Sequence, residues 1–199
     1  MKKLAIIVLL YLPLVVCAQK TPSAIEKKVL VCGACHGQTG VSPKPQWPNL
    51  AGQHVRYFVK QLKDMQAGTH RNAPTMTAFI VKLNDKEIDE MAAYYANIPI
   101  AKGITPQKLV KRGEQLYRGG DFEKQITACI ACHGPQGLGN DQAGFPVLAG
   151  QHSYYTVLQL QAYKKGQRTN DLSHVMQSIT NRMSHDDMEA VAHYIEGLH

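Results

Sequence analysis

The sequence predicts an all-α protein built from two domains in tandem. The chain repeats itself at an interval of about 98 residues, which is too long for a solenoid and indicates a duplicated domain. Sustained alternation of apolar and polar residues, the mark of a strand, is not found, whereas helical periodicity recurs. With 44% apolar and 19% charged residues among 199, the composition is that of a globular chain and excludes wholesale disorder.

Three blocks of sequence define the duplication. Their first and second copies begin at Cys32 and Cys129, at Pro48 and Pro146, and at Asp85 and His185. The intervals are 97, 98 and 100 residues, a drift that small loop insertions explain. We therefore expect a first domain over residues 19–101 and a second over 102–199. The joint between them falls at 98–105, where proline and glycine are concentrated.

Apolar residues at helical spacing predict the longer helices. Residues 53–66 place five apolar side chains on one stripe, and Gly68 ends that helix. Each predicted domain has fewer than 100 residues, and much of it is loop. Because apolar burial alone leaves so small a domain only marginally stable, a large cofactor in the core would help each one to fold.

Capping signals locate the remaining helix ends. Capping boxes are predicted before the last helix of each domain, at Asn84 with Glu87 and, in a weaker form, at Ser184 with Asp187. Thr105 is expected to cap the first helix of the second domain, with Pro106 in its first position and Gly119 at its end.

The first 18 residues have the pattern of a cleavable signal peptide. Lys2 and Lys3 precede an apolar run over 4–16, and small residues then predict cleavage before Gln19. An uncleaved anchor helix and a lipoprotein acylated at Cys17 are the alternatives. We expect the mature protein in the periplasm, an oxidising compartment.

Cys-x-x-Cys-His, which occurs once in each domain, is the attachment signature of c-type haem. Two thiols one helical turn apart reach the two vinyl groups on one porphyrin edge, and the histidine that follows points at the iron. The candidate thioether residues are Cys32 and Cys35 in the first domain and Cys129 and Cys132 in the second, with His36 and His133 as the proximal ligands.

Other uses of paired cysteines fit less well. A redox dithiol sits beside a βαβ pattern, which this sequence lacks. A zinc site needs two cysteine pairs about 12–20 residues apart, whereas 93 residues lie between Cys35 and Cys129. A disulfide within one motif would leave the histidine unexplained. Once the signal peptide is removed, the four remaining cysteines are all assigned to haem.

The two haem motifs, the two Pro-x-Leu-Ala-Gly-Gln segments at 48–53 and 146–151, the signal peptide and the length together resemble the dihaem cytochrome c4 family. That resemblance implies two class I cytochrome c domains related by a pseudo-twofold axis. It implies a close helix contact at Gly113 in the second domain, whereas the first domain departs from the family in having no equivalent glycine. It also implies two covalently bound haem c groups whose propionates face each other, and an electron-transfer function.

The sixth ligand of each iron is predicted from the repeat, because a ligand should recur in both domains. Met76 pairs with Met176 once a two-residue insertion is allowed, and both fall in a loop before the last helix, where the resembled family carries its axial methionine. His54 and His152 also recur, so bis-His ligation is the alternative; as helix-start residues they are expected to be exposed. Four methionines without a methionine partner are expected on apolar helix faces: Met65, Met91, Met183 and Met188.

Further residues around each haem are implied by the resemblance. The carbonyls of Pro48 and Pro146 are expected to accept the Nδ1–H of the proximal histidines, with ordinary turn prolines as the alternative. Three matched pairs complete the surroundings. They are Trp47 and Phe145 for the haem edges, Tyr57 and Tyr155 for either the propionates or the core, and Arg71 and Arg168 for the propionates.

The expected function is therefore electron transport in the periplasm, from a quinol–cytochrome c reductase to a terminal oxidase or a periplasmic reductase. The alternatives are the dihaem subunit of a periplasmic dehydrogenase, as in flavocytochrome-type sulfide oxidation, and a dihaem peroxidase, which would need an open distal site.

The net charge of +7 would also fit nucleic acid or a membrane surface. The basic residues are dispersed, however, so we expect no nucleic-acid partner and at most peripheral membrane association. Residues 19–101 carry +4 and residues 102–199 carry +1, which predicts that the two domains dock different partners.

Overall fold

The computed structural model describes residues 24–198, and the predicted signal peptide lies outside them. The first half of the described chain contains α1 (Ala24–His36), α2 (Val55–Ala67), α3 (Pro74–Ile80) and α4 (Asp85–Ala96). The second half contains α5 (Gln107–Glu114), the π-helical turn η1 (Gln115–Gly119), α6 (Ile130–His133), α7 (Ser153–Lys164), the 3-10 turn η2 (Leu172–His174), α8 (Val175–Asn181) and α9 (His185–Glu196). The prediction of an all-α fold is confirmed: the β pairing among these residues is limited to isolated bridges.

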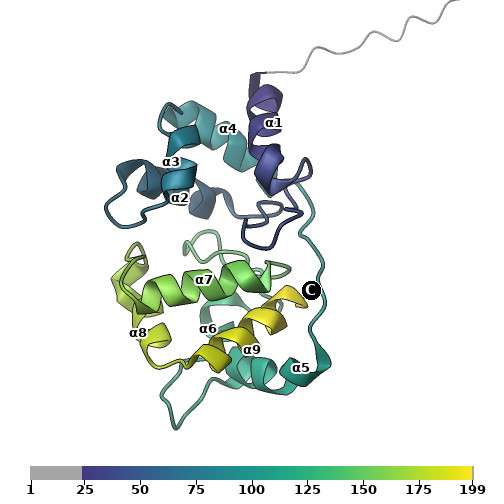
Figure 1. Ribbon diagram of the computed structural model, residues 1–199, viewed down its shortest axis with the longest axis vertical. Helices are drawn as coiled ribbons and strands as arrows, with labels where there is room; N and C mark the ends of the chain where they lie inside the picture. Colours follow the sequence, from purple (N-terminus) through teal and green to yellow (C-terminus); the bar gives the residue numbers. More distant parts are fainter. Residues whose placement is uncertain (1–23, 199) are drawn as a thin grey trace, which may run out of the picture.

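Each half has a hydrophobic core of its own, and the halves stack along the long axis of the molecule (Figure 1). In the first half, α4 packs against α1 and α2 and buries Ile88 and Tyr95 completely. In the second half, α9 packs against α5 and α7, and Leu116 and Tyr117 of η1 are completely buried. The repeated sequence thus yields two separate cores rather than one.

The helix ends follow the capping signals with one correction. Both capping boxes are confirmed, since the Asn84 and Ser184 side chains accept from the backbone three residues on. The prediction that Thr105 caps α5 is wrong: Pro106 has an extended ψ of 130° and occupies the cap position, so the helix begins one residue later. Thr105 instead donates from Oγ1 to the backbone oxygen of His193 over 3.0 Å, which ties the joint to α9.

The two halves differ in the segment that leads into the haem motif. In the first half α1 runs directly into the motif. In the second half η1 ends at Gly119, and a hairpin-like loop over 120–128 precedes the motif. Two backbone hydrogen bonds between Asp121 and Ile126, of 2.9 and 2.8 Å, close this loop, and Phe122 near its tip is 98% exposed.

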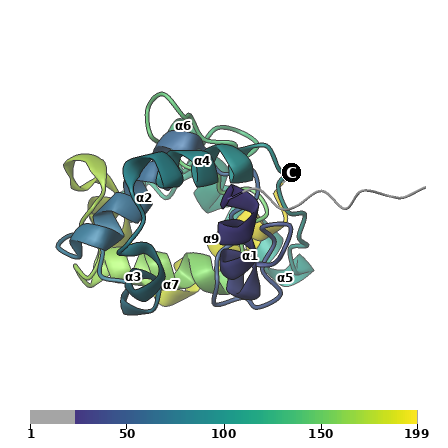
Figure 2. The ribbon, with the colours of Figure 1, turned by 90° about the horizontal axis from the view of Figure 1, so that it is seen from above.

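The two halves meet through side chains of α2 and α7 and through the loops that flank these helices on both sides (Figures 1 and 2). Arg71 and Arg168, which hold matching places, pair through an isolated antiparallel bridge across this boundary. The segment joining the halves lies against the second half, where Gly150 has a φ of 68° and a β-carbon would collide with the carbonyl of Ala101. Within residues 24–198, no helix combines the length and the apolar character needed to cross a membrane.

Candidate haem sites

The four motif cysteines lie at corresponding places, Cys32 and Cys35 in the last turns of α1, and Cys129 and Cys132 at α6. None of these four forms a disulfide, so all of their thiols are available for covalent attachment. Burial raises the pKa of Cys32, and it raises the pKa of Cys129 to about 11. The thiols of Cys32 and Cys129 are therefore neutral, and both pack against the apolar core of their own half.

Each motif histidine is oriented by a proline carbonyl in its own half. The distance from His36 Nδ1 to the oxygen of Pro48 is 2.9 Å, and that from His133 Nδ1 to the oxygen of Pro146 is 3.1 Å. Burial lowers the pKa of both histidines, although each proline hydrogen bond opposes that effect. A neutral imidazole that donates from Nδ1 leaves Nε2 as the nitrogen able to bind a metal.

The two methionines that recur lie at the edge of the two cores. Met76 packs against the first core together with Cys32, and Met176 packs against the second together with Cys129. The expectation that both lie in loops is wrong: they sit at the starts of α3 and α8, each a seven-residue helix. These helices are too short to show a clear apolar period in the sequence, which is why they were not predicted. The four other methionines within residues 24–198 are buried, as expected for core residues: Met65, Met91, Met183 and Met188.

The recurring histidines His54 and His152 both bind the opposite half of the molecule. Nε2 of His54 lies 2.7 Å from the oxygen of Leu138, and Nε2 of His152 lies 3.0 Å from the oxygen of Ser42. Both residues precede the first residue of a helix, as predicted, but the expectation that they are exposed is wrong: both are half-buried, because each side chain reaches the opposite half. The Nε2 nitrogens of both histidines thus serve hydrogen bonds between the two halves.

A buried pair of arginines lies where the two halves meet. Nη2 of Arg71 donates to the hydroxyl of Tyr155 over 2.8 Å, and Nη2 of Arg168 donates to the hydroxyl of Tyr57 over 2.9 Å. Both arginines also donate to Oε1 of Gln61. The matched residues thus exchange partners across the boundary, and the tyrosine hydroxyls serve this network.

Within residues 24–198, the two arginines of this network make no direct contact with a carboxylate, and the nearest one in the network, Asp64, is reached only through Asn170. Arg71 and Arg168 are only 8% and 4% exposed, and among the described residues neither forms a salt bridge. Burial would raise the pKa of Tyr57, but the two guanidinium groups outweigh this effect and lower it. Buried cations of this kind attract anionic groups, and the carboxylates of a haem are of that class.

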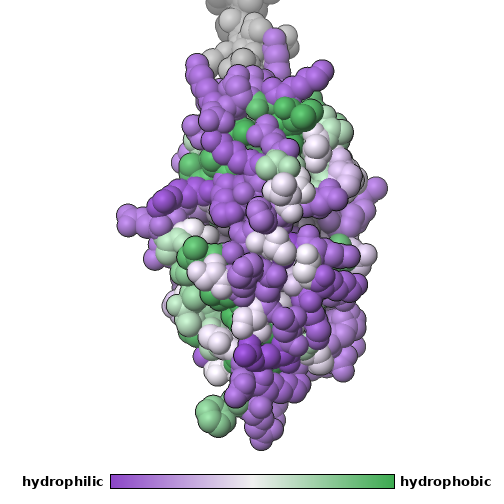
Figure 3. Space-filling view, turned by 90° about the vertical axis from the view of Figure 1, so that its left-hand side faces the viewer, coloured by the Kyte–Doolittle hydropathy of each residue, from purple (hydrophilic) through white to green (hydrophobic). Residues whose placement is uncertain are grey.

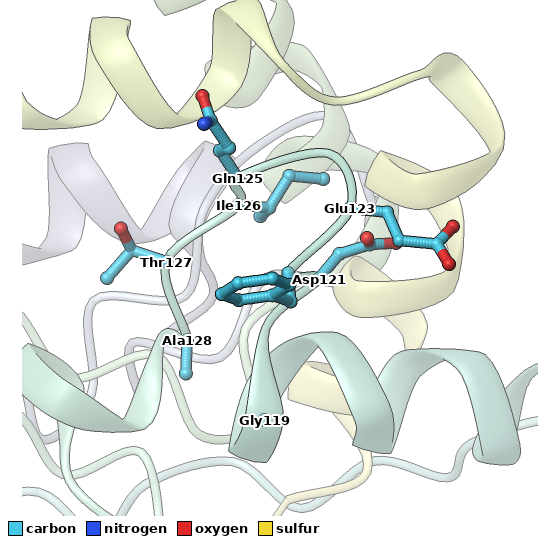
Figure 4. A pocket seen from close by; sticks show the side chains of 8 residues that line it. Gly119, Asp121, Glu123, Gln125, Ile126, Thr127 and Ala128 are labelled. Atoms are coloured by element: carbon cyan, nitrogen blue, oxygen red, sulfur yellow. The ribbon is translucent and has the colours of Figure 1, made fainter.

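The two haem motifs have different surroundings at the surface. A hollow of about 710 Å³ lies directly before Cys129 and is lined by residues of the 119–128 segment, including Thr127, Ala128 and Ile126 (Figure 4). In the first half, the residues that correspond to Thr127 and Ala128 are Leu30 and Val31 of α1. The second haem site therefore opens beside a polar loop, and the first beside a helix.

The residues present fit a haem in each half. Each half offers two free thiols and an available Nε2 nitrogen, and in the first half the hydroxyl of Tyr95 is buried beside the thiol of Cys32. Burial raises the pKa of Tyr95, which keeps this hydroxyl neutral. Residues 24–198 contain no cluster of three or more His, Cys, Asp or Glu side chains placed to hold a bare metal ion.

The helical fold and the paired motifs define a c-type cytochrome with two haem-binding domains. Family models agree, because residues 110–199 match the model described as cytochrome c. Residues 19–94 match the model of subunit III of cbb3-type cytochrome c oxidase.

The curated cytochrome c4 of Pseudomonas aeruginosa is 42% identical, with both chains covered completely. The crystal structure of reduced recombinant cytochrome c4 from Pseudomonas stutzeri is 43% identical, with a TM-score of 0.85 over 88% of this chain and 97% of that one. A thiosulfate dehydrogenase electron acceptor of Stutzerimonas stutzeri is 35% identical over 89% of this chain and 83% of its own length. The chain belongs to the cytochrome c4 family, and it is an electron-transfer protein with two covalently bound haem c groups.

Proposed function

We propose that this protein is a periplasmic electron carrier in which each iron is held between a histidine and a methionine. The proposed ligands are His36 with Met76 in the first half and His133 with Met176 in the second. Bound haem supplies a one-electron couple between ferric and ferrous iron. With one histidine and one methionine of the chain holding each iron, oxidation and reduction would require little rearrangement of the protein.

The observation that carries this proposal is the hydrogen bond from each motif histidine to a proline carbonyl of its own half. This bond fixes the ring plane and the protonated nitrogen before metal binding, so no reorientation is needed at the iron. Pro48 and Pro146 act in this way as residues that position the ligands. The placement of Met76 and Met176 at the same core edges as the motif cysteines supports methionine as the sixth ligand.

Ligation is tested by near-infrared absorption of the ferric holoprotein, in which a weak band reports methionine bound to iron. Met76→Leu and Met176→Leu are each expected to remove about half of this band and to lower one of the two redox potentials. Met65→Leu is the matched control, since Met65 is buried in α2, and it should leave the band unchanged. A full-strength band in Met76→Leu would contradict the assignment.

Partner choice is proposed to differ between the two halves. Exposed apolar side chains lie beside the first motif and near Met76, and they are 52–57% exposed: Leu30, Val31, Phe79 and Val81. Apolar patches also interrupt the mostly hydrophilic surface in the space-filling view (Figure 3). Together with its greater positive charge, this surface suits docking of the first half on an acidic, partly apolar partner such as a quinol–cytochrome c reductase or a terminal oxidase.

Docking is tested by stopped-flow electron exchange with the isolated respiratory complexes. Rates with a partner that uses the first half should fall as ionic strength rises, since screening weakens attraction between exposed charges. Rates that do not depend on salt would contradict electrostatic docking. The predicted export is tested by fractionation and mass spectrometry, with a mature chain that begins at Gln19 as the expected result.

A second candidate role is that of electron acceptor for a periplasmic dehydrogenase. The observation that favours it is the 35% identity to a thiosulfate dehydrogenase electron acceptor. In this role one half would accept electrons from the dehydrogenase and the other would pass them on. Co-purification with a dehydrogenase, and reduction of the cytochrome by its substrate at a rate above that with the respiratory reductase, would identify this role.

A further inference from the structure

Gln53 and Gln151 are the last residues of the two Pro-x-Leu-Ala-Gly-Gln segments, and each reaches into the opposite half. Gln53 is only 8% exposed although it lies outside a helix. The sequence pairs these two residues by their position in the repeat, but the repeat alone gave no sign of their contacts. Their side-chain amides cross the boundary between the halves and bind backbone groups there.

The amide of Gln53 binds both backbone groups of one residue in the second half. Its Nε2 donates to the oxygen of Val147 over 3.0 Å, and its Oε1 accepts from the nitrogen of Val147 over 3.0 Å. The same Oε1 accepts from the backbone nitrogen of His54 over 2.9 Å, which fixes the orientation of the amide. Gln53 therefore acts like one residue of a β-ladder, with two hydrogen bonds to a single partner.

Gln151 makes the equivalent contact with the first half. Its Nε2 donates to the oxygen of Asn49 over 3.0 Å, and its Oε1 accepts from the nitrogen of Asn49 over 2.8 Å. Asn49 adds a third interdomain bond, since its Nδ2 donates to the oxygen of Gly150 over 2.9 Å. Val147 holds the matching place in the second half and has no polar side chain, so that half depends more on its glutamine.

The residues that the two glutamines bind come directly after the prolines that orient the motif histidines. The nitrogen of Val147 and the carbonyl of Pro146 belong to one peptide group, and that carbonyl accepts from His133 Nδ1. A continuous chain of hydrogen bonds thus runs from Gln53 through this peptide group to His133. The equivalent chain in the first half runs from Gln151 through the peptide group of Pro48 and Asn49 to His36.

We propose that each glutamine positions and polarises the axial histidine of the opposite half, Gln53 acting on His133 and Gln151 on His36. This inference rests on the proposed function, in which these histidines bind iron. A peptide group whose N–H is hydrogen-bonded carries a more negative carbonyl oxygen, because hydrogen bonds in a chain strengthen one another. A stronger acceptor draws the Nδ1 proton away from the imidazole and makes Nε2 a better electron donor.

Loss of a glutamine therefore raises the redox potential of the haem in the other half, because a weaker donor stabilises ferric iron less. We expect Gln53→Met, which keeps the length and burial of the side chain, to change the reduction equilibrium constant of the second haem about three-fold. On this scale a ten-fold change is 59 mV for one electron. Gln151→Met should give a smaller change at the first haem, since Asn49 Nδ2 still holds the boundary there.

The test uses the holoprotein in a redox titration followed by NMR, with each haem assigned through contacts to its own motif. A second readout is hydrogen exchange of the Val147 and Asn49 amides, which should quicken in Gln53→Met and Gln151→Met respectively. The matched control is His54→Ala. It removes the neighbouring interdomain bond to the Leu138 carbonyl and leaves the Pro146–Val147 peptide group untouched.

The proposal is supported if each glutamine variant shifts the opposite haem and His54→Ala shifts neither. It is overturned if the potentials do not move, if the haem of the same half moves, or if His54→Ala produces the same shift. If Gln53→Met does not fold, Gln53→Asn gives the same test, because its shorter amide cannot reach Val147 in the same way. Failure of the proposed ligation would appear already in the unaltered protein as a missing near-infrared band, which separates the two outcomes.

Discussion

The guanidinium of Arg168 lies over the ring of Tyr163, with its central carbon 4.5 Å from the ring centroid. This contact comes from α7 of the same half and holds the charge at a fixed place on the domain boundary. From there Arg168 donates to Oη of Tyr57 in the first half. Arg168 is thus a buried cation that Tyr163 positions within the second half and that binds Tyr57 of the first half.

Removal of either interdomain tyrosine hydroxyl should weaken the whole molecule. Tyr57→Phe and Tyr155→Phe each delete a hydrogen bond to a buried arginine and are expected to cost about 1.5–3 kcal/mol in the free energy of unfolding. Urea unfolding followed by circular dichroism measures this. Tyr154→Phe is the matched control, because Tyr154 is 54% exposed in the same helix. Equal stabilities of the Tyr155→Phe and Tyr154→Phe variants would contradict the assigned role.

Asp187 should make the second half sensitive to acid. Desolvation raises its pKa, but hydrogen bonds from Lys124, Arg112 and the Ser184 capping box outweigh this and hold the pKa well below its ordinary value of 3.8. A carboxylate with a lowered folded-state pKa stabilises the fold above the ordinary pKa and loses that contribution as the pH falls below it. Asp187→Asn is expected to lose about 2 kcal/mol at pH 7.

The pH dependence separates this charge effect from a packing effect. The stability difference between the unaltered protein and Asp187→Asn should shrink as the pH falls below about 4, because the carboxyl itself becomes neutral. Glu189→Gln on the same helix is the control, since Glu189 is an exposed partner of His185. A difference that persists undiminished at pH 2 would show that the loss comes from packing rather than charge.

Gly113 should tolerate no larger residue. A β-carbon there would collide with the backbone oxygen of Ala190 and the β-carbon of Tyr194, where α5 crosses α9. Gly113→Ala is expected to cost about 1–3 kcal/mol through overpacking, measured by thermal unfolding of the holoprotein. Gly119→Ala is the control, because its β-carbon would meet no atom within 4 Å. An unchanged melting temperature in Gly113→Ala would mean that the two helices separate at little cost.

The sequence predicted what repetition and local chemistry determine. The tandem helical fold and both capping boxes follow from spacing and residue type, and the difference between the two N-terminal helices at Gly113 was expected from the family resemblance. The prolines that orient His36 and His133 were expected from a family resemblance, and the hydrogen bonds of the structure agree with that expectation.

Contacts between the halves could not be predicted in the same way. Gln53 and Val147 are 94 residues apart, and hydrogen bonding to a backbone leaves no pattern in the sequence of the partner. The short helices that carry Met76 and Met176 were also missed, because seven residues give too few turns for a period to show. The start of α5 was placed one residue too early because Pro106 fits both the cap and the first helical position.

The contacts between the halves have the form of an isologous dimer interface, in which both subunits use the same surface patch. Arg71 binds Tyr155 of the second half, and the matching Arg168 binds Tyr57 of the first. The duplicated chain is in this sense a homodimer whose subunits have been joined. The connecting segment does not have to create the interface, and its role is to raise the effective concentration of one half near the other. In a homodimer both subunits must have the same sequence, and the joined chain has no such constraint. The surfaces beside the two haem motifs could therefore diverge, so that the first lies beside a helix and the second beside a polar loop.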